Sequence, residues 1–123
     1  MRQQLRNQLR QLLPLVVIVT VVMGGVQALQ AWQSRGQGEA LRAAARPGDI
    51  LMLSSTTCFY CTQARDWMTE QRVPFTECFV EQDAACAATF QRLGGRGTPT
   101  LLVRGQVIVG FDRGRLLTVL SRS

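Results

Sequence analysis

The longest apolar segment of the chain lies close to its N-terminus. Residues 1–11 contain three Arg and no acidic residue, and residues 12–26 contain no charged residue. A basic start followed by a short apolar run is typical of a secretory signal peptide, and Val26 and Ala28 are small residues of the kind that precede a cleavage site. A helix over residues 12–29 only just reaches the ~30 Å needed to span the hydrocarbon core of a membrane.

Two interpretations of residues 1–29 remain open. The segment is either a signal peptide that is cleaved after Ala28 or a signal anchor that stays in the membrane with its Arg-rich start in the cytoplasm. In both cases we expect the rest of the chain on the periplasmic side of the inner membrane, anchored there or secreted. A buried core helix is disfavoured, because runs of Val and Ile and the Gly24-Gly25 pair make a poor soluble helix.

Residues 30–46 are predicted to form a linker. Ser34, Gly36 and Gly38 interrupt this segment, and residues 39–46 can form two turns of helix before Pro47 ends them. The expected role of the segment is to act as a spacer. The folded domain is then expected to occupy residues 47–123, a length that suits one small domain.

Within this domain the hydrophobic pattern alternates between strand and helix. Short apolar runs predict four strands, and apolar positions at helical spacing predict three helices. The expected strands cover residues 50–54, 73–80, 100–104 and 106–109, and the expected helices cover residues 58–72, residues 84–93 and the segment after Asp112. The order β-α-β-α-β-β-α predicts an α/β fold with a four-stranded mixed sheet and helices on both faces. Strands joined through helices are expected to pair in parallel, with an antiparallel hairpin at one edge.

Charge separates the two parts of the chain. The whole chain has a net charge of +6 and all of its 14 basic residues are Arg. Residues 1–46 hold six Arg against one acidic residue, whereas residues 47–123 hold eight Arg against seven acidic residues. A nearly neutral domain lacks the basic surface that binds nucleic acid, so nucleic acid is not an expected partner. The absence of His from the sequence also excludes His-containing catalytic triads and His metal ligands.

Cys58 and Cys61 are the candidate catalytic residues. They stand where the first predicted strand gives way to the first predicted helix, and the unpaired N–H groups of a helix start favour a thiolate. The pKa of Cys58 should therefore lie below the ~8.5 of a free cysteine. Cys61, one turn further on, is within disulfide distance but more sheltered. The pattern predicts that Cys58 attacks a disulfide and that Cys61 resolves the mixed disulfide.

Metal binding through the cysteines is the main alternative. The spacing of the four cysteines is C-x2-C-x16-C-x7-C, whereas a zinc ribbon needs a second pair as close as the first, so no structural metal site is predicted. A membrane-tethered thiol module that binds a soft metal such as Cu(I) through Cys58 and Cys61, without redox turnover, remains the alternative function.

Cys78 and Cys86 stand apart from this pair. They fall at the end of the second predicted strand and in the second predicted helix. Outside the cytoplasm, an even number of cysteines favours a structural disulfide between them that closes a short loop. Unpaired thiols and a second redox pair remain alternatives.

From residue 49 to about residue 120, the sequence resembles the glutaredoxins of the thioredoxin superfamily. The resemblance rests on Cys58-Phe59-Tyr60-Cys61, on Gly97-Thr98-Pro99 before a strand, and on Gly110-Phe111-Asp112 before the last helix. It implies a thioredoxin-like fold and a protein-disulfide or glutathione-disulfide oxidoreductase, whose direction of electron flow depends on its potential and partners. No cofactor is required, glutathione is a possible co-substrate, and protein thiols and disulfides are the expected partners. Some glutaredoxins also hold a [2Fe–2S] cluster between two subunits, which is a further alternative.

The resemblance also assigns substrate contacts beside the cysteines. An X-Pro bond is trans by default, but the matching proline of the superfamily is cis and faces the cysteine pair, so a cis bond is expected before Pro99. The main chain of Thr98 would then pair with an incoming peptide or with glutathione. The exposed rings of Phe59 and Tyr60 are expected to shape the rim on which the substrate docks.

The turn before the last helix is the third expected substrate contact. In glutaredoxins the turn that matches Gly110, Phe111 and Asp112 receives a carboxylate of glutathione, and Asp112 is also expected to cap the last helix. The present turn lacks the first Gly and the second Asp of the family pattern, and Ser55 replaces the family's basic residue three positions before the first cysteine. Both departures weaken the case for glutathione as the dedicated partner. In addition, no acidic residue lies in the first strand, where many thioredoxins bury one near the resolving thiol.

Overall fold

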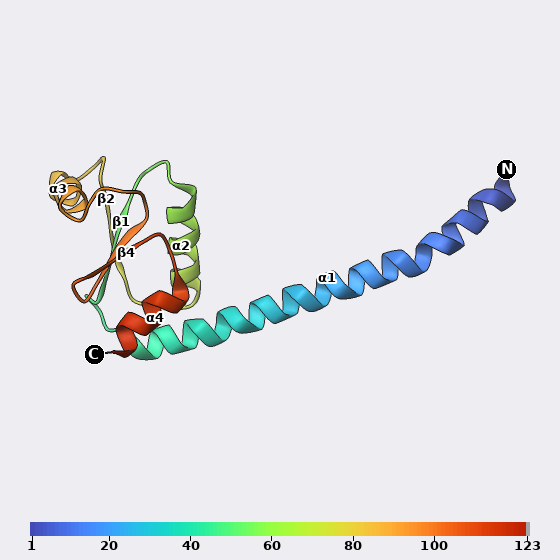
Figure 1. Ribbon diagram of the computed structural model, residues 1–123, viewed down its shortest axis with the longest axis horizontal. Helices are drawn as coiled ribbons and strands as arrows, with labels where there is room; N and C mark the ends of the chain where they lie inside the picture. The colour runs from blue at the N-terminus through green and yellow to red at the C-terminus, as the bar shows by residue number, and fades with distance from the viewer. Residues whose placement is uncertain (123) are drawn as a thin grey trace. The chain divides into compact units, whose positions relative to one another are not determined.

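The computed structural model describes residues 1–122, which fall into two units, residues 1–34 and the part of the chain from residue 35 onward. The first unit consists mainly of the N-terminal part of helix α1 (Arg2–Ala44), whose colour in Figure 1 runs from blue at the N-terminus to green at its end. This helix reaches a mean hydropathy of 2.3 over its most apolar stretch, and none of that stretch is buried. By length and composition α1 can cross a membrane, although a signal sequence meets the same criteria.

The expected interruption of residues 30–46 does not form. Helix α1 continues through Gly36 and Gly38 to Ala44, and Leu41, with none of its surface exposed, belongs to the core of the second unit. A Cβ atom at Gly38 would collide with the side chain of Gln71, so glycine here permits close packing rather than flexibility. Tertiary contacts therefore override the weak helix propensity of glycine.

The second unit is built on a four-stranded mixed sheet, as the hydrophobic pattern predicts. Its strand order is β2-β1-β3-β4. The helices α2, α3 and α4 connect or follow the strands. The strands are β1 (Ile50–Ser54), β2 (Thr76–Phe79), β3 (Thr100–Val103) and β4 (Gln106–Val109), and the helices are α2 (Phe59–Glu70), α3 (Ala84–Arg92) and α4 (Arg113–Ser121).

One strand direction differs from the prediction. β1 pairs in parallel with β2, but β3 runs antiparallel to β1, although a helix separates β2 from β3. Phe79 at the end of β2 lies opposite Ser54, and Thr100 at the start of β3 lies opposite Leu53. The end of β2 and the start of β3 therefore lie at the same edge of the sheet, the one at which β1 also ends. Helix α3 and its loops connect these two points without crossing to the opposite edge. This connection brings Pro99 to the edge at which Cys58 follows β1.

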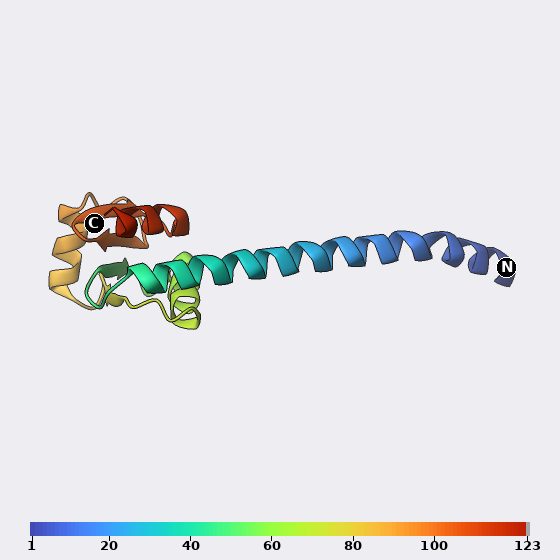
Figure 2. The same ribbon diagram turned by 90° about the horizontal axis from the view of Figure 1, so that it is seen from below.

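Helices cover both faces of the sheet. Figures 1 and 2 show α3 on one face, with α2 and α4 on the other. The core between α2, α4 and the sheet also takes in the last turns of α1. Its buried members are Leu41, Ala45, Ile50, Met52, Ala64, Met68, Val73, Leu101, Val103, Ile108, Leu116, Val119 and Leu120.

Candidate functional site

Cys58 occupies the N-cap position of α2. Its backbone is extended (φ −97°, ψ 112°), and its Sγ accepts a hydrogen bond from the backbone N–H of Cys61 at 3.1 Å. A capping side chain accepts hydrogen bonds from the free N–H groups of the first helical turn, a position that Ser, Thr or Asp usually fills. When the disulfide is reduced, the same N–H groups and the positive end of the helix dipole favour negative charge on this sulfur.

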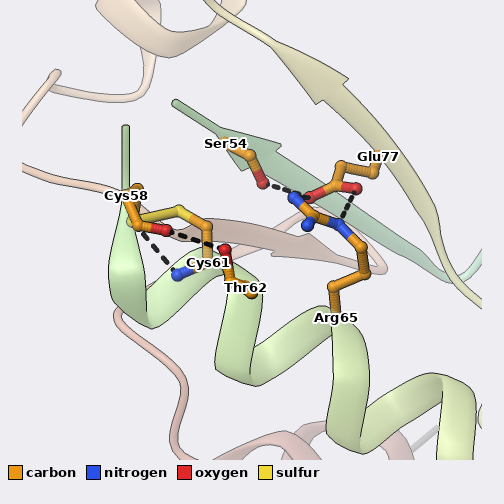
Figure 3. A network of polar contacts seen from close by, with 6 residues as sticks. All are labelled: Ser54, Cys58, Cys61, Thr62, Arg65 and Glu77. Carbon is orange, nitrogen blue, oxygen red and sulfur yellow. Dashed lines mark hydrogen bonds and ion pairs between the residues drawn. A yellow bond between two sulfur atoms is a disulfide. The ribbon is translucent and has the colours of Figure 1, made fainter. Parts of the chain in front are cut away.

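The two cysteines of the pair differ in accessibility. A disulfide joins Cys58 to Cys61, with 5.2 Å between their Cα atoms (Figure 3). Cys58 is partly exposed, whereas Cys61 is completely buried. The side chains of Phe59 and Tyr60 are each 68% exposed. An incoming thiol or disulfide can therefore reach Cys58, and Cys61 can be reached only through Cys58.

The Thr98–Pro99 peptide bond is cis and lies beside the cysteine loop. The pairing of Leu53 with Thr100 places residues 98–99 alongside residues 54–55, which lead to Cys58. Pro99 is buried, Thr98 is partly exposed, and the carbonyl of Pro99 accepts a hydrogen bond from the N–H of Gly110 at 2.7 Å. The loop before β3 and the loop after β4 therefore meet at one edge of the sheet.

The turn before α4 has a structural role. Gly110 has a φ of 86°, which favours glycine. The Asp112 carboxylate accepts a hydrogen bond from the N–H of Arg115 at 3.0 Å and so caps α4. The ring of Phe111 packs on Trp67 of α2, with 5.7 Å between ring centroids. Substrate contacts of these three residues, like those of Phe59, Tyr60 and Thr98, stay predictions.

A partly buried ion pair lies one helical turn beyond Cys61, and sequence reasoning missed it (Figure 3). Arg65 donates to both carboxylate oxygens of Glu77 at 2.7 and 2.9 Å, and the Ser54 hydroxyl donates to Glu77 at 2.7 Å. Burial raises the pKa of Glu77, but the hydrogen bonds from Arg65 and Ser54 outweigh it and the pKa is lowered overall. The sheet thus carries an acidic residue, Glu77, on β2, next to β1, which has no acidic residue.

A second carboxylate that the sequence analysis did not single out holds the loop before Cys58. The hydroxyl of Ser55 and the N–H of Thr56 both donate to Glu81, the latter at 3.1 Å. The Ser55 hydrogen bond in particular lowers the pKa of Glu81, so this carboxylate is ionised at neutral pH. Because β1 and β2 are parallel, residues that follow the two strands meet at one edge, a signal that could have revealed the contact.

The second disulfide joins Cys78 of β2 to Cys86 in the first turn of α3, with 6.0 Å between Cα atoms. Cys86 is 4% exposed. The N-cap of α3 is Asp83, which accepts from the N–H groups of Ala85 and Cys86. This disulfide therefore fastens a helix to the sheet, and a carboxylate supplies the capping that Cys58 supplies in α2.

Potential metal ligands do not gather elsewhere in the described structure. Within residues 1–122, no group of three or more His, Cys, Asp or Glu side chains is placed to hold a metal ion.

Comparison with known proteins supports the fold and relates the second unit to the glutaredoxins. Residues 50–108 match the model of the glutaredoxin family. A mutant of the thioredoxin-like protein BC3987 superposes with a TM-score of 0.54 at 24% identity, over 60% of this chain and 96% of that one. The methanoredoxin of Methanosarcina acetivorans gives a TM-score of 0.51 at 22% identity, over 62% and 87% of the two chains. The glutaredoxin of Methanosarcina mazei Go1 superposes with a TM-score of 0.50 at 21% identity, over 59% of this chain and 78% of that one. No curated protein matches the chain.

The family match and the cysteine geometry agree. The residues matched include Cys58 and Cys61, which are bonded to each other at the start of α2. A glutaredoxin-type domain with such a pair supports a function of the thiol–disulfide oxidoreductase kind. The part of the chain that carries the cysteine pair is a glutaredoxin-like domain of the thioredoxin superfamily.

Proposed function

We propose that the protein is an enzyme that exchanges disulfides with protein substrates through Cys58 and Cys61, with glutathione as a possible co-substrate. The observation that carries this proposal is the asymmetry of the pair. Cys58 is partly exposed and caps α2, whereas Cys61 is completely buried one turn further on. This arrangement suits an attacking sulfur followed by a resolving one.

The exchange proceeds in two steps in the direction that reduces a substrate. The Cys58 thiolate attacks one sulfur of the substrate disulfide, which forms a mixed disulfide and releases the other sulfur as a thiolate that takes up a proton. Cys61 then gives up its proton and attacks the Cys58 sulfur, which forms the Cys58–Cys61 disulfide and releases the second substrate thiol. Two electrons pass from the domain to the substrate, and the reverse sequence oxidises a substrate dithiol.

Residues around the pair supply the docking surface in this proposal. The exposed rings of Phe59 and Tyr60 flank Cys58. The main chain of Thr98, beside the cysteine loop, is placed to pair with an extended substrate segment as an added strand would. Because Cys61 is buried, it can attack the mixed disulfide at Cys58 but not a disulfide in solution.

Trapping of the intermediate tests the proposal. In Cys61→Ser, Cys58 can attack but the mixed disulfide cannot be resolved, so mass spectrometry should find a covalent adduct with a disulfide substrate. Cys58→Ser should form none. The double variant Cys78→Ser/Cys86→Ser is the control and should turn over without accumulating an adduct. Equal loss of bound Cu(I) from both single variants, with no adduct in either, would instead support the soft-metal module.

The proposal places the domain on the periplasmic side of the inner membrane, secreted or anchored through residues 1–29. The Arg-rich start and the exposed apolar stretch of α1 support this placement. A reporter that is active only outside the cytoplasm should be active when fused after Ser123. Activity of a cytoplasm-dependent reporter alone at the same position would contradict it.

A further inference from the structure

We propose that Glu81 is a specificity-determining residue that disfavours anionic disulfides such as glutathione disulfide and favours uncharged or cationic peptide disulfides. This inference rests on the proposed function and names the substrate class of the same site. It follows from the position and the charge of the Glu81 carboxylate.

Hydrogen bonds hold Glu81 on the turn that leads to the attacking sulfur. The N–H of Cys58 donates to the carbonyl of Ser55 at 3.3 Å, so Ser55 and Cys58 form the two ends of one tight turn, in which Cα atoms three positions apart lie within about 7 Å. Glu81 accepts hydrogen bonds from two residues of this turn, Ser55 and Thr56. The carboxylate is therefore fixed on the turn that presents Cys58.

The charge of Glu81 differs from that of its neighbour on β2. Glu77 is partly buried and forms an ion pair with Arg65, which offsets its charge. Glu81 is exposed, and the groups that donate to it are an uncharged hydroxyl and an uncharged amide. These hydrogen bonds favour the ionised carboxylate but bring no positive charge to offset it. The negative charge of Glu81 can therefore act on a substrate that approaches Cys58.

The sheet register shows which side of the site carries this charge. Val80 continues the pairing of β2 with β1 through a hydrogen bond from its N–H to the carbonyl of Ser54 at 3.0 Å. Glu81 therefore flanks the cysteine loop on the β2 side, and Thr98 flanks it on the β3 side. Since β1 separates β2 from β3 and neighbouring strands lie about 4.8 Å apart, the two flanks are roughly 10 Å apart, which is about one Debye length at 0.1 M salt.

The consequence for chemistry is selective repulsion. A glutathione unit carries two carboxylates and one ammonium group, so glutathione disulfide is anionic near neutral pH. Repulsion between single charges at this range, in partly aqueous surroundings, changes a rate constant by a few-fold per unit charge. The same field attracts a substrate disulfide whose neighbouring side chains are cationic.

The experiment compares three disulfides of different charge. The reduced full-length protein, in detergent, is oxidised by glutathione disulfide (anionic), bis(2-hydroxyethyl) disulfide (uncharged) or cystamine (cationic), and the rate constants are measured at low salt. In Glu81→Gln the amide oxygen can still accept from Ser55 and Thr56, so the loop should keep its conformation. Its ratio of glutathione disulfide to cystamine rates should rise about 10-fold, and the change should shrink in ~1 M salt.

Two further variants separate charge from structure. Glu70→Gln removes the same charge at the far end of α2, about 16 Å along the helix from its start, and should leave the ratio at the wild-type value. Glu81→Asp keeps the charge and should keep the wild-type preference. The use of a ratio cancels any change in the intrinsic reactivity of Cys58 that affects all three disulfides alike.

The outcomes distinguish this inference from the proposed function. If wild-type Cys58 reacts with none of the three disulfides, the proposed function fails. If it reacts with them but Glu81→Gln leaves the ratio unchanged, or if Glu70→Gln shifts it equally, the role of Glu81 is overturned and the exchange function stands.

Discussion

The two disulfides of the protein are chemically the same bond in two different settings. Cys58 and Cys61 lie three positions apart within the start of one helix, whereas Cys78 and Cys86 lie eight positions apart and join a strand to a helix. In the first pair one sulfur is partly exposed and caps the helix, and in the second pair Asp83 does the capping. The two pairs therefore differ in exposure and in which group caps the helix rather than in the bond itself, and this difference is the basis for proposing exchange chemistry at one pair and a structural role for the other.

The largest expected difference between the two pairs is in activity. Cys58→Ser should abolish disulfide exchange, because it removes the accessible sulfur. The double variant Cys78→Ser/Cys86→Ser should keep exchange within a few-fold of the wild-type rate. The measurement is the rate of reduction of a peptide disulfide by each reduced protein. Equal loss of activity in both variants would show that the second pair takes part in electron transfer.

The second difference is in stability. Loss of the Cys78–Cys86 link in the double variant should lower the free energy of unfolding by ~2–4 kcal/mol, because the unfolded chain regains the freedom that the closed loop removes. Urea denaturation of the oxidised proteins measures this change. An unchanged midpoint, or free thiols at both positions in protein recovered from the periplasm, would contradict a structural role.

A smaller effect is expected from the residue that caps α3. Asp83→Ala removes the acceptor for the N–H groups of Ala85 and Cys86 and should cost about 1 kcal/mol. Thermal or urea denaturation should detect the loss, with exchange activity retained. Asp83→Ser restores a capping oxygen and is the matched control. If Asp83→Ser is as unstable as Asp83→Ala, capping is not the cause.

The smallest expected effect is a pH dependence of stability from Glu77. Hydrogen bonds from Arg65 and Ser54 lower the pKa of Glu77 in the folded protein despite its burial. Its contribution is therefore fully present above the unfolded pKa, near 4.5, and is lost as the pH falls through the lower folded value. As the pH falls below about 5, wild-type stability should therefore fall more steeply than that of Glu77→Gln. Parallel pH profiles would rule out this contribution.

Much of the fold and the position of the pair follow from local sequence signals. The apolar run of β1, the helical spacing after Cys58 and the hairpin around Gly105 each predict their element. The direction of β3 does not follow, because it depends on how α3 and its loops return the chain across the sheet. The continuation of α1 through Ser34, Gly36 and Gly38 was also missed, because packing of Leu41 and Gly38 against the domain overrides glycine propensity.

The polar part of the site was harder to predict than the cysteines. Arg65 and Glu77 are twelve positions apart, and Ser55 and Glu81 are 26 apart. Such contacts depend on the register of β1 against β2, which the hydrophobic pattern does not specify. The cysteines needed no register, because both lie in one turn of one helix.

The central claim is that Cys58 is the accessible, attacking sulfur and Cys61 the sheltered, resolving one. It is tested most directly by brief alkylation of the reduced full-length protein at neutral pH, with the modified cysteine identified by peptide mass spectrometry. The account predicts that the alkylation rate of Cys58 exceeds that of Cys61 by about tenfold or more. A cysteine at a helix start is more readily ionised to the reactive thiolate, whereas a buried thiol is inert. Equal modification of the two cysteines, or faster modification of Cys61, would contradict it.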